Sequence, residues 1–167
     1  VYSALGRYDD ALASYTKAVE LMPGNPSAYS ARAGVYLAMQ RYSNALLDYD
    51  EVVKLSPDIV DGYWGRGLVY EAQEAYEEAI AEFSEVIKRE PDIPRGYNAR
   101  ALMYYNRKQY MQAQVDYKKA VELAHDLGDN EQEINALAGL ALSLYFKEDY
   151  DEAVSYTHLR AHETGRN

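Results

Sequence analysis

The 167-residue chain contains no cysteine, only two phenylalanines and a single tryptophan. Without cysteine there is no disulfide, thiol nucleophile or cysteine-based metal site. No apolar run approaches the roughly 18 residues that a membrane-spanning helix needs. Basic residues are outnumbered by acidic ones, which gives a net charge of −10 and argues against a nucleic-acid partner, since phosphates need a basic surface. A cysteine-free chain fits the cytoplasm, although a leader or an anchor could precede Val1.

What the sequence has in abundance is tyrosine, and the tyrosines recur at a constant interval. Four of the 18 tyrosines are equally spaced along the chain, at Tyr8, Tyr42, Tyr76 and Tyr110. Each is followed three positions later by alanine, and four positions after that by an aromatic residue. Prolines keep the same interval, at Pro23, Pro57 and Pro91. A constant period of about 34 residues is the signature of a repeat protein.

The spacings within one repeat are those of amphipathic helices. One stripe has its members at i, i+3, i+7 and i+10, on a single helix face: Tyr42, Ala45, Tyr49 and Val52. A similar stripe precedes it: Tyr29, Ala33 and Tyr36. Asn25 followed by Pro26 is typical of a helix start, and Pro57 is typical of a helix end. Each repeat is therefore predicted to be two antiparallel helices, which bury their stripes only by stacking on neighbouring repeats.

This pattern resembles the tetratricopeptide repeat (TPR) family. The family motif falls on Tyr29, Ala33, Tyr36, Tyr42, Ala45, Tyr49, Val52 and Pro57. It recurs in the next two repeats, except that His125 stands where the last proline is usual. The resemblance implies an all-α fold, a right-handed α-solenoid of antiparallel helix pairs (a TPR superhelix). It predicts one solenoid over residues 1–153, made of a partial unit 1–25, full units 26–59, 60–93 and 94–127, and a partial, longer unit 128–153.

The last unit has a longer period than the others. The interval from Tyr110 to Tyr150 exceeds the earlier intervals between motif tyrosines, and Ala153 keeps the usual offset from Tyr150. We assign the extra residues to 128–133, so the helix before them is predicted to run longer, with Gly128 or Asn130 near its end. Three residues are then predicted to take the positions that Tyr97, Ala101 and Tyr104 hold in the unit before: Leu137, Ala141 and Leu144.

Several repeated columns are predicted to be structural. Alanine at 45, 79 and 113 lets helices approach closely, and a larger side chain there is expected to cost about 1–3 kcal/mol. The tyrosine columns are expected to fill space between helices rather than bind a ligand. An arginine on each first helix precedes a carboxylate on the second helix at a constant spacing: Arg32 and Asp48, Arg66 and Glu82, Arg100 and Asp116. We predict ion pairs, each partly exposed and contributing little; the alternative is an arginine row that binds acidic ligands.

Function is expected where the repeats differ. The resemblance implies a concave groove, lined by the first helices, that receives a peptide or helix of a protein partner. Its variable positions begin with Ser27, Ser30, Gly34, Leu37 and Ala38. The predicted binding residues follow, an apolar and aromatic patch with a polar rim: Asp61, Trp64, Leu68, Glu71, Arg95, Asn98, Leu102 and Tyr105. The alternative for Trp64 is packing on the next unit. One TPR subfamily binds a partner's terminal carboxylate with a lysine, whose position here holds Ser30, Trp64 and Asn98, so that clamp is not expected.

Nothing in the sequence supports catalysis. It has no Ser/His/Asp constellation, phosphate-binding glycine loop or paired carboxylates outside the repeat, so we predict no enzyme, no cofactor and no metal site. His125 is expected to be a solvated turn residue. The chain is predicted to be a protein-interaction scaffold. The alternative is the regulatory or docking segment of a larger enzyme, or of an envelope lipoprotein, whose other domains lie outside this sequence.

The last residues of the chain depart from the repeat. His158 and His162 lie four positions apart, a spacing that would suit zinc on a helix. However, Thr157 and Arg160 stand where an aromatic and a small residue are expected. Residues 154–164, VSYTHLRAHET, resemble a translated sequencing-library (tagmentation) adapter. We therefore predict that residues 154–167 are a non-native tail, and exclude both histidines from the functional prediction.

Overall fold

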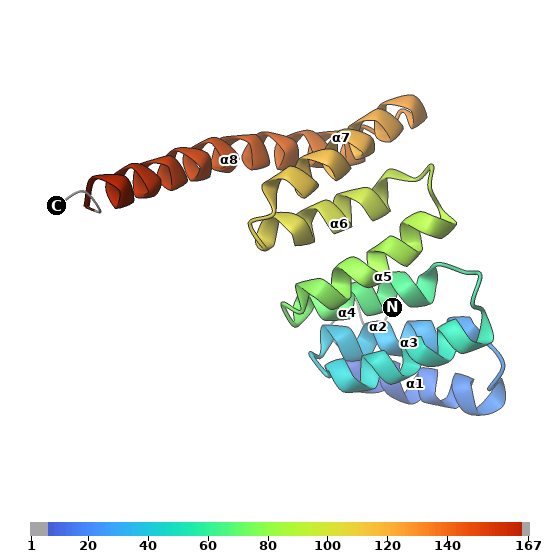
Figure 1. Cartoon of the computed structure of the whole chain (residues 1–167). Coiled ribbons are helices and arrows are strands. Elements are labelled where there is room, and N and C mark those ends of the chain that lie inside the picture. Colours follow the sequence, from blue (N-terminus) through green and yellow to red (C-terminus); the bar gives the residue numbers. More distant parts are fainter. Residues whose placement is uncertain (1–6, 165–167) are drawn as a thin grey trace. The chain divides into compact units, whose positions relative to one another are not determined.

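The computed structural model describes residues 7–164 of the chain, and side chains for residues 7–147. Every element in this part is a helix: α1 (Tyr8–Leu21), α2 (Pro26–Ala38), α3 (Tyr42–Leu55), α4 (Asp61–Ala72), α5 (Tyr76–Arg89), α6 (Pro94–Asn106), α7 (Tyr110–Leu127) and α8 (Asn130–Thr164) (Figure 1). Helices adjacent in sequence pack in pairs, α2 with α3, α4 with α5 and α6 with α7. The predicted fold class, an all-α solenoid of antiparallel helix pairs, is confirmed.

The helix ends follow from local sequence. Asn25 caps α2 by accepting a hydrogen bond from the backbone N–H of Ser27 at 3.0 Å, and Pro26 is the first helical residue. Both features satisfy or remove backbone donors that the first turn of a helix leaves unpaired. Helix α3 ends at Leu55, two positions before Pro57. The predicted boundaries at these positions are confirmed.

Each first helix turns into its second helix through one left-handed residue. Gln40, Glu74 and Lys108 have φ values of 57°, 57° and 59°, and each lies two positions before a motif tyrosine. The N–H of the next residue reaches back to the carbonyl oxygen of Tyr36, Tyr70 or Tyr104, at 2.8–2.9 Å. This closure is a Schellman motif, which satisfies carbonyls at the helix end. None of the three residues is glycine, so each turn carries a conformational cost.

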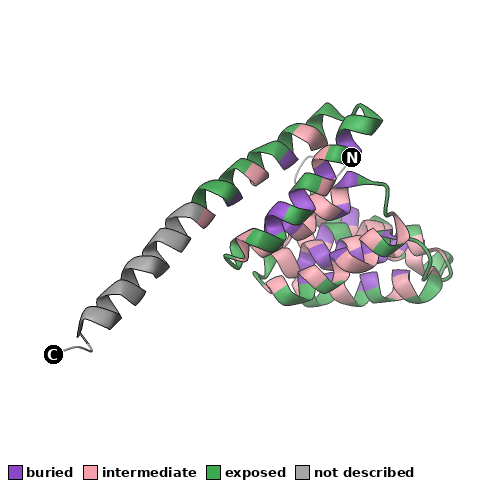
Figure 2. Ribbon diagram, turned by 45° about the horizontal axis from the view of Figure 1, so that its top comes forward, coloured by how far each residue is buried: buried purple, intermediate pink, exposed green. Residues whose placement is uncertain are grey.

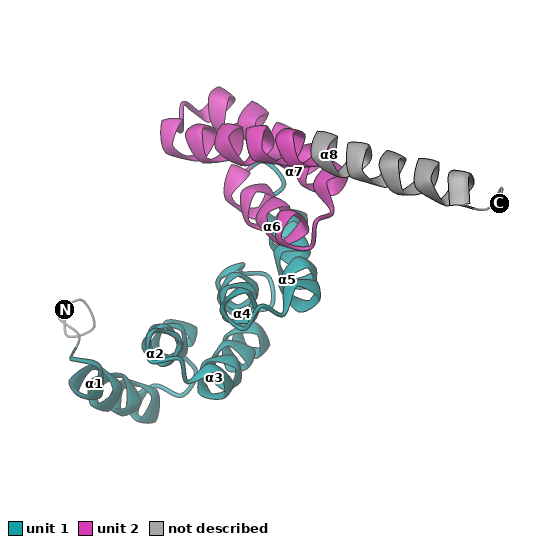
Figure 3. Ribbon diagram, turned by 90° about the vertical axis from the view of Figure 1, so that its left-hand side faces the viewer, with its two compact units in different colours: residues 1–92 teal, residues 93–167 magenta. Residues whose placement is uncertain are grey.

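The chain forms two compact units, residues 1–92 (the N-terminal unit) and residues 93–167 (the C-terminal unit) (Figure 3). The core of the N-terminal unit includes Ala33, Ala45, Tyr49, Val52 and Val69. The core of the C-terminal unit includes Ala101, Ala113, Tyr117, Ala120 and Ala136. Ala45, Ala79 and Ala113 are completely buried, as predicted for positions of close helix approach.

The predicted ion pairs between first and second helices form. Arg32 donates from Nε and Nη2 to both oxygens of Asp48, each at 2.7 Å, and Arg100 binds Asp116 in the same two-pronged way at 2.7 and 2.8 Å. Arg66 binds Glu82 and also Asp50. The expectation that these pairs are partly exposed is wrong for Asp48 and Asp116, which are 5% and 4% exposed.

The burial of these carboxylates changes the energetics of the pairs. The hydrogen bond from Arg100 to Asp116 raises the pKa of Arg100, although burial acts in the opposite direction. A buried charge that loses its partner is costly, by about 3–5 kcal/mol. The arginine column is therefore part of the scaffold, and each pair joins a first helix to the second helix that follows it.

Helices α7 and α8 show where the extra residues of the longer last repeat lie. Helix α7 has 18 residues and ends at Leu127, followed by Gly128 with a φ of 66°, so the predicted extension is confirmed. His125 consequently lies in the last helical turn rather than in a loop; it is exposed, and its Nδ1 is 3.4 Å from Oε1 of Glu133. Helix α8 continues without a break from Asn130 to Thr164, whereas in the earlier repeats the residues equivalent to Tyr150 each begin a new helix: Tyr42, Tyr76 and Tyr110.

The predicted stripe on α8 is not packed. Leu137 and Leu144 are 48% and 43% exposed, and Ala141 is exposed too. Figure 2 shows that most of the described part of α8 is solvent-exposed. Among the side chains of α8 that the structure describes, up to residue 147, the buried ones are Ala136 and Ser143, and these lie on another face of the helix. The difference arises because the stripe would face a following helix, which the uninterrupted α8 does not provide.

Candidate interaction surfaces of the two units

The predicted binding residues fall on two helices in different units. Helix α4 of the N-terminal unit carries Asp61, Trp64, Leu68 and Glu71, and α6 of the C-terminal unit carries Arg95, Asn98, Leu102 and Tyr105. Within each helix the spacing is i, i+3, i+7 and i+10, which places the four residues on one face. The structure therefore presents two separate candidate surfaces, each of which has its own environment.

On α4, the aromatic residue is anchored in the core of its own unit. The ring centroid of Trp64 lies 5.3 Å from that of Phe83, at an interplanar angle of 54°. Phe83 is completely buried, whereas Trp64 and Leu68 are half-buried. A tilted aromatic pair at this distance is favourable. It fixes the orientation of the indole ring while part of the side chain keeps contact with solvent.

The face of α4 is acidic at both ends. Asp61 is exposed in the first turn and Glu71 is half-buried in the last turn. Burial raises the pKa of the Glu71 carboxyl, because a desolvated carboxylate is less stable in its charged form. Burial also raises the pKa of Tyr49, and the nearby charge of Asp61 adds to that shift. None of the four residues on this face is cationic.

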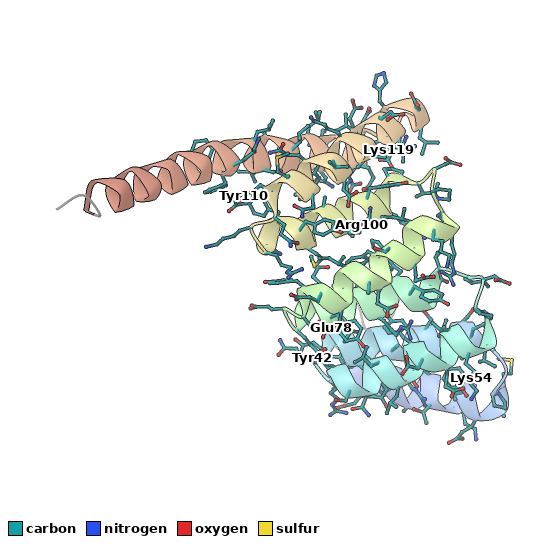
Figure 4. The ribbon with its side chains drawn as sticks, in the orientation of Figure 1. Tyr42, Lys54, Glu78, Arg100, Tyr110 and Lys119 are labelled. Atoms are coloured by element: carbon teal, nitrogen blue, oxygen red, sulfur yellow. The ribbon has the colours of Figure 1, made fainter. Side chains whose placement is uncertain are left out.

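On α6, two of the four residues are committed to contacts within the C-terminal unit. The side-chain amide of Asn98 donates to the backbone oxygen and to Oε1 of Gln132, at 3.2 and 2.8 Å. The ring of Tyr105 lies 5.6 Å from Tyr110 and 6.0 Å from Phe146, at the end of α6 where Tyr110 begins α7 (Figure 4). Leu102 is the most open of the four apolar residues predicted to bind, at 38% exposed.

A small cavity in the N-terminal unit adds residues that the sequence did not single out. It has a volume of about 50 Å³ and is lined by Pro26, Ser27, Ser30, Val52, Ser56, Ile59 and Asp61. Ser27, Ser30 and Asp61 were assigned to variable groove positions from the sequence. Ser56 and Ile59 were missed because they lie in the turn between α3 and α4, where the repeat pattern assigns no side chain to the groove.

The side chains of residues 7–147 contain no cluster of three or more acidic, histidine or cysteine groups that could hold a metal ion. The side chains of His158 and His162 lie outside the described residues. Within the described part of the chain, no helix is both long enough and apolar enough to cross a membrane.

Comparison with protein families identifies the repeat. Two models described as tetratricopeptide repeat match residues 30–92 and 92–156, and a model described as TPR repeat matches residues 1–40. No curated protein sequence matches the chain.

Solved structures with similar folds include MamA from Desulfovibrio magneticus RS-1, in a form beginning at residue 41, with a TM-score of 0.75 and 20% identity over 99% of this chain and 91% of that one. A complex of the TPR2B domain of yeast Sti1 with an Hsp70 peptide has a TM-score of 0.68 and 19% identity, over 72% of this chain and 96% of that one. The first TPR domain of Spaghetti, bound to the HSP90 peptide SRMEEVD, has a TM-score of 0.59 and 28% identity, over 63% of this chain and 85% of that one.

Proposed function

Because the chain belongs to the tetratricopeptide repeat family, we propose that it is a protein-interaction scaffold without catalytic activity of its own. It binds a peptide or a helix of a partner protein in the concave groove that the first helices line. The residues proposed to contact the partner are Asp61, Trp64, Leu68 and Glu71 on α4, and Arg95, Asn98, Leu102 and Tyr105 on α6.

One observation carries this proposal. Repeated scaffold positions such as Ala79 and Phe83 are completely buried, whereas the variable apolar positions Trp64, Leu68 and Leu102 keep contact with solvent. Apolar and aromatic side chains that a scaffold leaves accessible, next to charged residues, are typical of binding hot spots. The peptide-bound domain of Spaghetti, at 28% identity, offers a precedent for a peptide ligand.

The partner is expected to differ from the acidic peptide seen with Spaghetti. Helix α4 presents Asp61 and Glu71 but no cation at the four face positions, so an acidic peptide would meet like charge there. The position that holds lysine in carboxylate-binding TPR domains is occupied by Ser30, Trp64 and Asn98. A neutral or basic peptide therefore suits this surface better.

The test is selection of a phage-displayed library of random dodecapeptides on the immobilised protein, followed by fluorescence polarisation with the enriched peptides. Trp64→Ala is expected to weaken binding more than tenfold, as truncation of an aromatic hot spot does. Leu47→Ala is the control, because Leu47 is 65% exposed on the second helix α3, which carries none of the residues proposed to contact the partner. Circular dichroism establishes that both variants are folded. Enrichment of the same peptides on Trp64→Ala, with unchanged affinity, would contradict the proposal.

A further inference from the structure

The cavity between α2, the end of α3 and the start of α4 has the size and lining of a binding site for a lysine side chain. We propose that it receives the ammonium group of a lysine in the partner peptide, with Asp61 as counter-ion and Ser27, Ser30 and Ser56 as hydrogen-bond acceptors. This inference rests on the proposed function, and adds to it the residue type that the N-terminal unit recognises.

The size of the cavity favours a compact cation. Its volume is about 50 Å³, whereas a cavity can hold one water molecule from about 10–15 Å³ upwards. The site therefore has room for an ammonium group and the end of its stem. The guanidinium group of arginine is a wide planar fork that needs a flat, two-pronged acceptor. The cavity thus fits the head of a lysine side chain better than that of an arginine.

The polar part of the lining matches what an ammonium group requires. The polar residues of the lining are Asp61, which carries a carboxylate, and Ser27, Ser30 and Ser56, which each carry a hydroxyl group. No side chain of the lining carries positive charge. Within the part of the chain that the structure describes, these four side chains make no hydrogen bond and no ion pair with other protein groups. An ammonium group has three N–H donors and no acceptor, so it can donate to the carboxylate and to hydroxyl groups at the same time.

The apolar part of the lining suits the rest of the same side chain. Pro26, Val52 and Ile59 border the cavity, and Ile59 is 49% exposed. Lysine buries its methylene stem along apolar surface while its charged end contacts polar groups. A lining divided between apolar side chains and oxygen atoms therefore corresponds to the two parts of one lysine.

Other small ligands suit the site less well. An anion would be repelled by Asp61, the one charged residue of the lining. A calcium ion takes 6–8 oxygen ligands, usually from several carboxylates, and the lining supplies a single carboxylate. Lys54, near the end of α3, does not neutralise Asp61 as a partner, because its Nζ binds Oε1 of Glu51 at 2.9 Å.

The experiment uses the peptides selected on the full chain. Each lysine of an enriched peptide is replaced by norleucine, which keeps the stem and removes the ammonium group, and separately by arginine. We expect one lysine whose replacement by norleucine weakens binding about fivefold to tenfold, as for a charge-assisted hydrogen bond that is partly exposed. On the Asp61→Asn variant the same replacement should have little effect, because the counter-ion is already gone.

Asp58→Asn is the matched control. Asp58 is exposed in the same turn but is not part of the cavity lining, so this variant removes an equal charge and should leave the lysine effect unchanged. Ser30→Ala should reduce the effect about twofold to threefold by removing one acceptor.

The outcomes separate this inference from the function on which it rests. Enriched peptides that depend on Trp64 but tolerate norleucine at every lysine would overturn the lysine site and leave the scaffold function supported. Arginine that binds as well as lysine, or a norleucine effect that is as large on Asp61→Asn as on the unchanged chain, would also overturn it. If no peptide is enriched, both proposals are wrong.

Discussion

Helices α6 and α8 occupy the same position in successive repeats, yet their equivalent stripes have opposite environments. In α6 the small residue of the stripe, Ala101, is completely buried in the core that α6 and α7 share. In α8 the corresponding Ala141 is exposed, although the residue two positions before it, Gly139, packs closely against the ring of Tyr117 on α7. A first helix thus buries one face on the preceding helix by itself. Its other face needs a second helix that follows.

The two helices also differ in the residue that joins a first helix to the following second helix. Arg100 of α6 pairs with Asp116 on α7, and Figure 4 labels this arginine on α6. Leu140 holds the matching position of α8, because it follows Arg100 by the same interval as Tyr150 follows Tyr110. Leu140 packs against the core of the C-terminal unit. Helix α8 therefore lacks the ion pair that fixes each earlier helix pair. The following predictions test whether this pair and this stripe account for the contrast.

The largest effect is expected from breaking the ion pair of α6. Replacing Asp116 by alanine removes the buried carboxylate that accepts hydrogen bonds from Nε and Nη2 of Arg100, whose side chain is 22% exposed. We expect the free energy of unfolding to fall by about 3–5 kcal/mol, measured by urea denaturation. Glu122→Ala is the control, since it removes an exposed carboxylate of α7 and should cost less than about 1 kcal/mol. Equal effects of the two variants would show that the burial of Asp116 is unimportant.

The next largest effect compares one substitution at two equivalent positions. Ala101→Leu inserts three carbon atoms into a fully packed site and is expected to destabilise the protein by about 1–3 kcal/mol. Ala141→Leu places the same atoms on an exposed stripe and should change stability by less than about 0.5 kcal/mol. Thermal and urea unfolding measure both. A loss at Ala141 as large as the loss at Ala101 would mean that a helix covers α8 in solution.

These positions also show what the sequence could predict. The regular period of the repeats was enough to predict the helix pairs, the buried alanines and the partners of Arg32, Arg66 and Arg100, because each depends on spacing along regular helices. The burial of Asp48 and Asp116 did not follow from spacing, since it depends on how closely the helices pack. The uninterrupted α8 was also missed, because the motif residues Tyr150 and Ala153 specify a second helix only if enough of that helix follows. The adapter origin of residues 154–167 stays a prediction, and a genomic read across Ala153 tests it.

The candidate surfaces were predictable only in part, because only some of their residues are set by spacing along regular helices. The spacing of Asp61, Trp64 and Leu68 placed them on one helix face. The contacts of Asn98 with Gln132 and of Tyr105 with Phe146 involve α8, and no repeat column indicates them. Ser56 and Ile59 come from a turn whose shape places them at the cavity. Contacts that depend on turns and on the irregular last unit are therefore those that a periodic pattern cannot supply.

A smaller effect on stability should appear at alkaline pH, through Tyr117 of α7, which packs with residues of both α6 and α8. Tyr117 belongs to the core of the C-terminal unit, and burial raises its pKa to about 12, compared with an ordinary value near 10. The raised folded-state value means that Tyr117 contributes full stability below pH 10 and loses it as the pH rises towards 12. We expect a loss of about 1–2 kcal/mol over that range, since each unit of pKa shift corresponds to about 1.4 kcal/mol and only part of the shift is titrated.

The measurement compares urea unfolding of the unchanged chain with that of Tyr117→Phe at pH 9 and pH 11. Phenylalanine cannot ionise, so the difference in stability between the two proteins should shift in favour of Tyr117→Phe at the higher pH. Tyr145→Phe is the control, because Tyr145 is 62% exposed on α8, and it should show no such shift. A shift of equal size in both variants would mean that Tyr145 is buried in solution, as Tyr117 is.

The smallest expected effect on stability concerns the turn that follows α6 and that α8 lacks. The same substitution is expected to stabilise the protein at one of the two positions and to destabilise it at the other. Lys108 lies in the turn after α6 with a φ of 59°, a conformation that glycine adopts without the steric cost paid by other residues. Lys108→Gly should therefore stabilise the protein by about 0.5 kcal/mol. This value already includes the opposing effect of glycine, which makes the unfolded chain more flexible.

Residue 148 is the equivalent position, two positions before Tyr150, but it lies within the continuous helix α8. Glu148→Gly should then lower helix content and stability by about 0.5–1 kcal/mol, measured by circular dichroism in the far ultraviolet and by thermal unfolding. Stabilisation at both positions would instead show that α8 turns at residue 148, and that the contrast between the two helices is lost in solution.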